Sequence, residues 1–228
     1  MPTFRPELND EDQKWIKQQQ LFFVASAPLT SSGRVNMSPK GYDSFRILSP
    51  KKVAYLDISG SGIETITHLN ENGRLTFMFC AFEGAPKILR LWCKGSVHPN
   101  GSKKYQTLLP ELFPDFADQG GVRSIIVGDI LEISLSCGFG VPLYEFKEKR
   151  QVLLNYWGKK KPEQITEYWA EKNATSIDGI PSQLSQSTKS WLQTKLHIWR
   201  DSVGPLSMGL IAGSVITVAV MKSGAVSK

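Results

Sequence analysis

The chain has 228 residues, of which 41% are hydrophobic and 21% are charged, a composition typical of a globular protein with one sizeable core. Its net charge of +6 is scattered along the sequence without any nucleic-acid-binding motif, so nucleic acid is excluded as an expected partner. The histidines and cysteines show no metal-ligand spacing, so no metal site is predicted. Cys80, Cys93 and Cys137 lie in apolar stretches and are expected to be buried thiols.

The N-terminal part of the chain is predicted to contain one helix followed by short strands. The polar residues 11–20 predict the helix. Residues of high β-propensity predict strands over 21–27, 34–38 and 52–58, with turn residues between them.

A short helix is predicted after the third strand, over residues 64–72. A tight turn precedes this helix and Gly73 ends it. His68 follows Glu64 by about one helical turn, so the two side chains are expected to form an ordinary surface pair rather than a catalytic one.

Longer strands are predicted in the middle of the chain. Apolar and polar residues alternate over 75–80, 89–94 and 131–136, which gives each strand one apolar face. Residues 101–118 show no alternation and predict a helical excursion. Many strands with few helices between them favour an antiparallel barrel over a parallel sheet.

The C-terminal part is predicted to be helical from Tyr144 onward, with a loop over 173–187. Val203–Met221 carries no charge, and at about 1.5 Å per residue a helix of this length would cross the bilayer core of about 30 Å. Gly209 and Gly213 have the small-xxx-small spacing that suits helix packing in lipid. The stretch is interpreted as a membrane tail that keeps the rest of the chain in the cytoplasm, and the alternative is a buried or frayed C-terminal helix.

The turn between the third strand and the helix is the local feature with the clearest chemistry. In Ser59–Thr65, glycines let the chain approach a ligand closely and hydroxyl groups can donate hydrogen bonds. A helix N-terminus adds backbone N–H groups and the positive end of the helix dipole. The turn therefore predicts either a phosphate site or ordinary helix capping.

Three segments, in this order and spacing, resemble one protein family. Gly33–Gly41, Val53–Asp57 and Ile88–Gly95 are similar to segments of the pyridoxamine-5′-phosphate-oxidase-like flavin-binding split barrels. Ser176–Pro181 is similar to a segment that follows the barrel in one branch of that family. The resemblance covers residues 15 to about 185.

The resemblance implies a mainly β fold with helices, namely a split β-barrel of the FMN-binding type followed by a helical C-terminal extension. The predicted boundaries are 11–143 for the barrel, 144–200 for the extension and 203–221 for the tail. FMN is the implied cofactor, and a homodimer with the cofactor at its interface is implied as well. The implied cofactor-binding residues are Arg34, Val35, Asn36, Met37, Ser38, Lys40, Ser59, Gly60, Ser61, Gly62, Thr65 and Arg90.

Two departures from the family pattern bear on function. Well-studied members carry a Ser-Arg-Lys run where Ile63-Glu64-Thr65 stands here, and Glu64 has the wrong charge to lie beside a phosphate. The C-terminus lacks the Arg- and Trp-rich substrate segment of the true vitamin B6 oxidases, so oxidation of pyridoxamine phosphate is disfavoured. The sequence predicts an FMN-binding oxidoreductase for an unidentified small molecule, with no catalytic side chain assigned. The alternative is a non-catalytic flavin-binding or cofactor-free interaction module tethered to a membrane.

Overall fold

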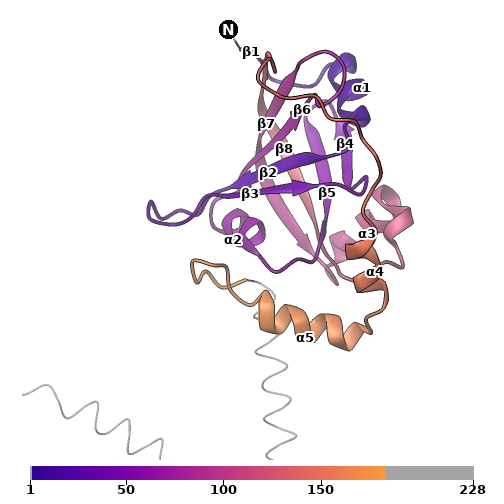
Figure 1. The fold of residues 1–228 in the computed structure, drawn as a ribbon. Coiled ribbons are helices and arrows are strands. Elements are labelled where there is room, and N and C mark those ends of the chain that lie inside the picture. Colours follow the sequence, from indigo (N-terminus) through magenta and orange to yellow (C-terminus); the bar gives the residue numbers. More distant parts are fainter. Residues whose placement is uncertain (1, 183–228) are drawn as a thin grey trace, which may run out of the picture. The chain divides into compact units, whose positions relative to one another are not determined.

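The computed structural model describes residues 2–182, and their strands form one antiparallel sheet (Figure 1). The strands are β1 (Thr3–Arg5), β2 (Phe22–Ser26), β3 (Asn36–Lys40), β4 (Phe45–Ser49), β5 (Lys52–Ile58), β6 (Arg74–Cys80), β7 (Ile88–Pro99) and β8 (Val122–Ser136). Their order is β3-β2-β6-β7-β8-β5-β4, and β1 pairs with β8. The edge strands β3 and β4 do not pair with each other within residues 2–182, so the barrel is open. The predicted mainly β split barrel with helices is confirmed.

The strand β8 organises the sheet. It is 15 residues long and pairs with β1, β5 and β7. Residues 122–128 are buried on both faces because helices cover the side turned away from the barrel interior, and this part does not alternate in sequence. The alternation at 131–136 therefore marked only the end of a longer strand.

The interior of the barrel is an aromatic cluster. Phe22, Phe45, Tyr55, Phe77 and Phe79 pack together with ring centroids 5.0 to 6.1 Å apart. Burial of each such ring contributes about 2 to 3 kcal/mol. The strand β4, which supplies Phe45, was not predicted because its residues do not alternate clearly between apolar and polar.

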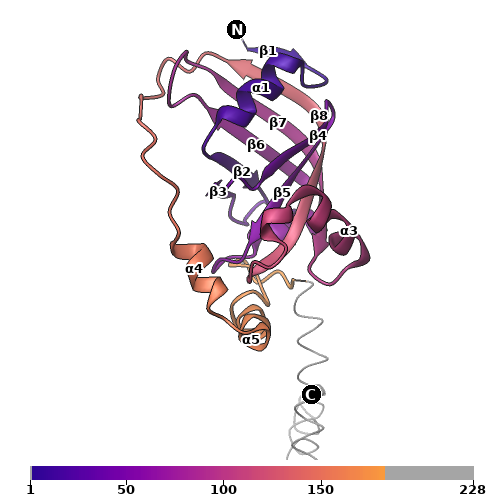
Figure 2. The ribbon, with the colours of Figure 1, turned by 90° about the vertical axis from the view of Figure 1, so that its right-hand side faces the viewer.

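Helices lie near both ends of the sheet (Figures 1 and 2). They are α1 (Asp10–Gln18), α2 (Glu64–Glu71), α3 (Lys103–Leu112), the 3-10 helix η1 (Pro114–Phe116), α4 (Val152–Gly158) and α5 (Pro162–Lys172). The Asn9 side chain caps α1 by accepting the N–H of Asp12, and α3 with η1 forms the predicted helical excursion. In both views α1 lies near one end of the sheet and α3, α4 and α5 lie near the other.

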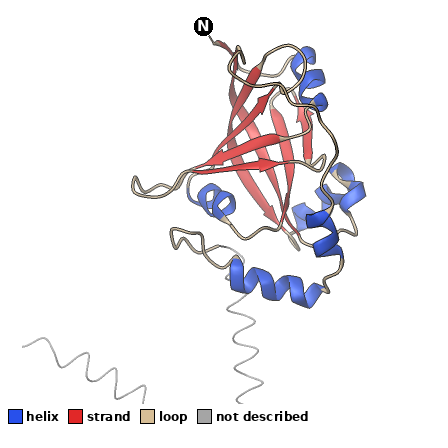
Figure 3. Cartoon of the chain, viewed as in Figure 1, coloured by secondary structure: helices blue, strands red, loops and turns tan. Residues whose placement is uncertain are grey.

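The C-terminal part differs from its prediction. Residues 144–151 contain no helix, and the helical part begins at Val152 instead of Tyr144 (Figure 3). Within residues 2–182 no helix is long and apolar enough to cross a bilayer. The expected tail over 203–221 and the end of the expected extension lie outside the described residues.

Two side-chain expectations need correction. Cys80 and Cys93 are buried as expected, and burial raises the pKa of Cys93 to about 12, but Cys137 is exposed because it follows the end of β8. His68 is not on the surface: it is fully buried where α2 packs on the sheet, and its Nδ1 forms a 3.0 Å hydrogen bond with the Ser26 hydroxyl. Burial lowers the pKa of this imidazole, against the opposing effect of Glu64.

Candidate ligand cleft

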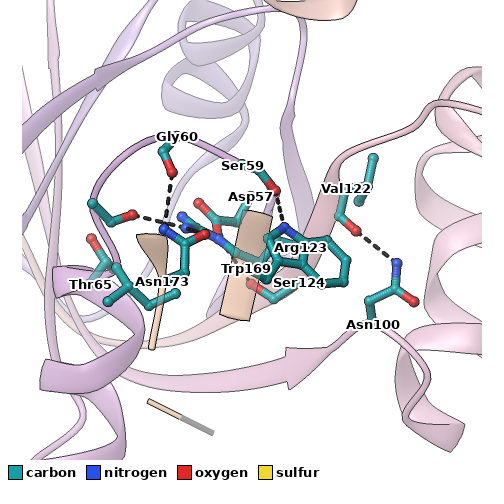
Figure 4. A network of polar contacts seen from close by, with 12 residues as sticks. Asp57, Ser59, Gly60, Thr65, Asn100, Val122, Arg123, Ser124, Trp169 and Asn173 are labelled. Carbon is teal, nitrogen blue, oxygen red and sulfur yellow. Dashed lines mark hydrogen bonds and ion pairs between the residues drawn. The ribbon is translucent and has the colours of Figure 1, made fainter. Parts of the chain in front are cut away.

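A buried ion pair holds the base of the turn that follows β5 (Figure 4). Arg123 Nε donates to Asp57 Oδ2 at 2.8 Å, and the Ser124 hydroxyl donates to the same oxygen at 3.3 Å. Lys40 Nζ lies 3.8 Å from the other carboxylate oxygen. Burial opposes ionisation of Asp57, but the Arg123 and Lys40 charges outweigh it and lower the pKa of this carboxyl. The pair is therefore ionised at neutral pH.

The same arginine reaches the turn itself. Arg123 Nη1 donates to the Gly62 carbonyl and to Asn173 Oδ1, both at 2.8 Å. Asn173 Nδ2 donates to the carbonyls of Gly60 and Ser61 at 3.1 and 3.4 Å. Three successive carbonyls of the turn are thus held by side chains from β8 and from the segment after α5 (Figure 4). This fixes the conformation of the turn.

Ser59 is fully buried and its polar groups are already used. Its hydroxyl donates to the Gly121 carbonyl at 2.7 Å and accepts from Trp169 Nε1 at 2.6 Å. Its carbonyl accepts from Trp157 Nε1 at 2.9 Å. Gly121 has φ +77° and lies against the Trp157 ring, where a Cβ would approach within 2.3 Å. In this arrangement Ser59 acts as an anchor for the turn and does not face a ligand.

A cleft lies between the beginning of β3, the turn and the beginning of α2. Its volume is about 570 Å³, and its lining residues come from these three elements and from the segment after α5: Arg34, Val35, Asn36, Met37, Ser61, Gly62, Glu64, Thr175, Ser176 and Ile177. Asn36 Nδ2 donates to the Thr65 hydroxyl at 3.0 Å, which ties β3 to α2 beside the cleft. The Ser38 hydroxyl donates to Asn36 Oδ1 at 3.2 Å and orients that amide.

The predicted cofactor-binding residues are brought together in part. Arg34, Val35, Asn36, Met37, Ser61 and Gly62 line the cleft. Ser38 and Thr65 bond to Asn36, whereas Lys40 points to Asp57. Ser59 is buried beneath the turn, and the Gly60 carbonyl binds Asn173.

Arg90 lies apart from the other predicted residues. Pro99, nine positions further along β7, pairs with Ser124 near the turn, so Arg90 is about 30 Å along the strand from that end. Its guanidinium instead contacts the Ser136 hydroxyl at 3.3 Å. Within one chain Arg90 does not reach the cleft.

Sequence reasoning missed Arg123, Asn173 and Trp169. Two charges that adjoin buried apolar runs, Asp57 after 53–56 in β5 and Arg123 shortly before 125–127 in β8, could have indicated a buried pair. Asn173 and Trp169 carry no comparable signal, because the contact joins residues more than 100 positions apart.

The cleft fits a flavin in size but not fully in charge. Ligand sites commonly enclose about 300 to 1,000 Å³, and the cleft lies within that range. The Glu64 carboxylate lines it, and the Arg34 guanidinium is 2.6 Å from Asp178 Oδ1. Arg123 is already paired with Asp57. A phosphate would therefore need Arg34 to leave Asp178.

A curated relative matches the chain over a long region. The chain is 46% identical over 147 residues to the pyridoxamine 5′-phosphate oxidase family protein ustO from Aspergillus flavus. The match covers 64% of this chain and 58% of that protein, so the chain spans less than two thirds of its relative's length. No protein-family model matches the chain.

Solved structures align with the chain only weakly. HupZ from group A Streptococcus aligns over 55% of this chain and 91% of its own, with 20% identity and a TM-score of 0.44. HutZ from Vibrio cholerae, a heme storage protein, aligns over 57% and 94%, with 15% identity and a TM-score of 0.40. An FMN-binding protein from Syntrophomonas wolfei aligns over 54% and 80%, with 10% identity and a TM-score of 0.36. These likenesses carry no argument about function. The 46% identity to ustO confirms the resemblance drawn from the sequence motifs: over these 147 residues the chain is similar to a pyridoxamine 5′-phosphate oxidase family protein.

Proposed function

We propose that the chain binds FMN in the cleft between β3, the turn and α2. The observation that carries the proposal is that Arg34–Met37 and the turn residues Ser61 and Gly62, which the resemblance assigns to flavin binding, line one cavity of about 570 Å³. The backbone of β3 beside Asn36 would face the ring, and the N-terminus of α2 with Arg34 would face the phosphate.

The bound flavin would supply electron transfer, and the chain would supply position. Asn36 and Thr65 hold β3 and α2 at the spacing of the cleft. Arg123 and Asn173 hold the turn carbonyls, so the turn does not need to reorganise when a ligand enters. On this basis the protein is an FMN-dependent oxidoreductase for an unidentified small molecule.

The second candidate is a non-catalytic flavin-binding or cofactor-free interaction module. The observation in its favour is the charge of the cleft, where Glu64 faces the ligand space and Arg34 is paired with Asp178. Both features lower the expected affinity for a phosphate.

Equilibrium dialysis of the purified full-length protein against FMN tests the proposal. Retention with a dissociation constant of a few micromolar, about −7 to −8 kcal/mol, is the expected result. No retention would contradict FMN binding and favour the cofactor-free module. Oxidation of reduced nicotinamide by the loaded protein would distinguish an oxidoreductase from a passive flavin carrier.

We also propose that the protein is a homodimer through the outer face of the sheet. Val35 and Leu131 are 72% and 65% exposed, and with Trp92 they line a hollow of about 350 Å³. Monomeric proteins rarely expose large apolar patches without function. Analytical ultracentrifugation should show a dimer that Leu131→Glu dissociates, and a monomeric wild-type protein would contradict the proposal.

The tail over 203–221 is proposed as an anchor in an intracellular membrane. Its lack of charge is the supporting observation. Alkaline carbonate extraction should leave the full-length protein in the membrane and release a version that ends at Asp201. Equal release of both would contradict the anchor.

A further inference from the structure

The segment Asn173–Ser182, here called the C-terminal loop, forms one wall of the cleft through Thr175–Ile177. It is a compact hairpin in which Ser182 N–H bonds to the Ala174 carbonyl and Ser176 N–H to the Ile180 carbonyl, both at 2.9 Å. The left-handed Gly179, at φ +78°, closes its tip. Asp178 stands at this tip and is presented by a folded element, not by a loose end of chain.

The C-terminal loop is bonded to both other walls of the cleft. The Glu64 carboxylate on α2 accepts the Ile177 N–H at 3.2 Å. On the side of β3, Asp178 Oδ1 accepts from Arg34 Nη1 at 2.6 Å, and Asp178 Oδ2 accepts the Arg34 backbone N–H at 2.7 Å. The Asp178 carboxylate therefore binds both the guanidinium and the backbone N–H of Arg34.

The two partners of this ion pair differ in freedom. The Asp178 side chain is 12% exposed and is fixed by its bond to the backbone, whereas the Arg34 side chain is 65% exposed. A long, solvated guanidinium can change partner at little cost. Asp178 stays in place while Arg34 can move.

Arg34 is the one cationic side chain among the described residues that line the cleft. The neighbouring cations Arg123 and Lys40 both face Asp57, and Arg123 is almost completely buried. A phosphate group in the cleft would thus have to take Arg34 from Asp178.

We propose that Asp178 is a specificity-determining residue of the cleft, which disfavours phosphorylated ligands relative to the same ligands without phosphate by competing for Arg34. The proposal rests on the flavin site proposed above, because it concerns which form of flavin that site prefers. The C-terminal loop then sets the charge that the cleft accepts, in addition to forming its wall.

The test compares riboflavin with FMN, which differ by one phosphate. Flavin fluorescence titration of the full-length protein gives the ratio of the riboflavin to the FMN dissociation constant. Asp178→Asn should raise this ratio by about threefold to tenfold, as expected for release of a partly screened charge pair. Asp178→Ser removes the same charge with another turn-compatible side chain and should give the same shift, so the result does not depend on one variant.

Two controls isolate the competition. Asp43→Asn removes the carboxylate that lies 3.3 Å from Arg46 outside the cleft, and it should leave the ratio unchanged. In an Arg34→Gln background, Asp178→Asn should change the ratio of dissociation constants less than half as much as in the wild-type protein. The reason is that Arg34, the cation for which Asp178 and the phosphate compete, is absent.

The outcomes separate the two proposals. If wild-type protein binds both flavins and the ratio does not move in the Asp178 variants, the role of Asp178 is wrong and the flavin site stands. An equal rise in the Arg34→Gln background also overturns competition for Arg34. If no form of the protein binds either flavin, the flavin site itself is wrong and the inference falls with it.

Discussion

Two arginine–aspartate pairs flank the cleft, and they differ in burial. Arg123 and Asp57 have side chains that are 5% and 2% exposed, and Arg123 also holds the turn through the Gly62 carbonyl. Arg34, paired with Asp178, is largely exposed. A buried pair cannot lose one member without leaving an uncompensated charge, whereas an exposed pair can exchange partners. The buried pair thus holds the turn that borders the cleft, whereas the exposed pair sets the charge available to a ligand in the cleft.

Removal of the buried arginine should have the largest effect. Arg123→Ala leaves Asp57 buried without its main partner, and the free energy of unfolding should fall by about 3 to 5 kcal/mol. Urea denaturation followed by tryptophan fluorescence measures this change. Arg34→Ala is the matched control and should cost no more than about 1 kcal/mol. Equal losses in the two variants would contradict the distinction between the pairs.

The loss of folding stability at low pH should depend on Asp57. Its pKa is lower in the folded protein than the ordinary value of 3.8, so the unfolded chain takes up a proton first as the pH falls. The stability from this group is fully present above about pH 4 and is lost as the pH falls through the folded-state pKa. In Asp57→Asn the free energy of unfolding should therefore fall less steeply below about pH 4, by at most about 1.4 kcal/mol per pH unit. Parallel pH profiles for the two proteins would show that Asp57 is not the group responsible.

The smallest effect is expected at Glu64. Glu64→Gln removes a negative charge that lines the cleft, and its amide oxygen can still accept the Ile177 N–H. FMN affinity should rise by about twofold to threefold, and the free energy of unfolding should change by less than about 1 kcal/mol. FMN titration and urea denaturation measure the two quantities. Weaker FMN binding would mean that holding the C-terminal loop matters more than the repulsion.

The barrel was predictable where burial leaves a periodic pattern. The strands around Phe77 and Leu91 have one face inside and one outside, so their residues alternate, and the structure has strands there. The first half of β8 is buried on both faces and carries no such pattern. His68 shows the same limit for helices, because spacing along α2 does not reveal that its polar residues also face the sheet.

The cleft was predictable only in its local parts. The segment that begins at Arg34 and leads into β3 and the turn at Gly62 were recognised from residue types, and both line the cavity. The wall formed by the C-terminal loop was not recognised as part of a site, because its contacts with Arg34 and Glu64 bridge more than 100 residues. Ser59 had the right residue type for a phosphate donor, but Trp169 and Gly121 occupy its hydroxyl.

The bond between Ser59 and Trp169 has a consequence for the order in which the protein is completed during synthesis. The two residues are 110 positions apart, so at about 5 to 20 residues per second Trp169 is added roughly 5 to 20 s after Ser59. The eight strands found within residues 2–182 have all been synthesised by then, since β8 ends at Ser136. The residues of these strands are therefore all present in the nascent chain before the indole that binds the serine-glycine turn is added.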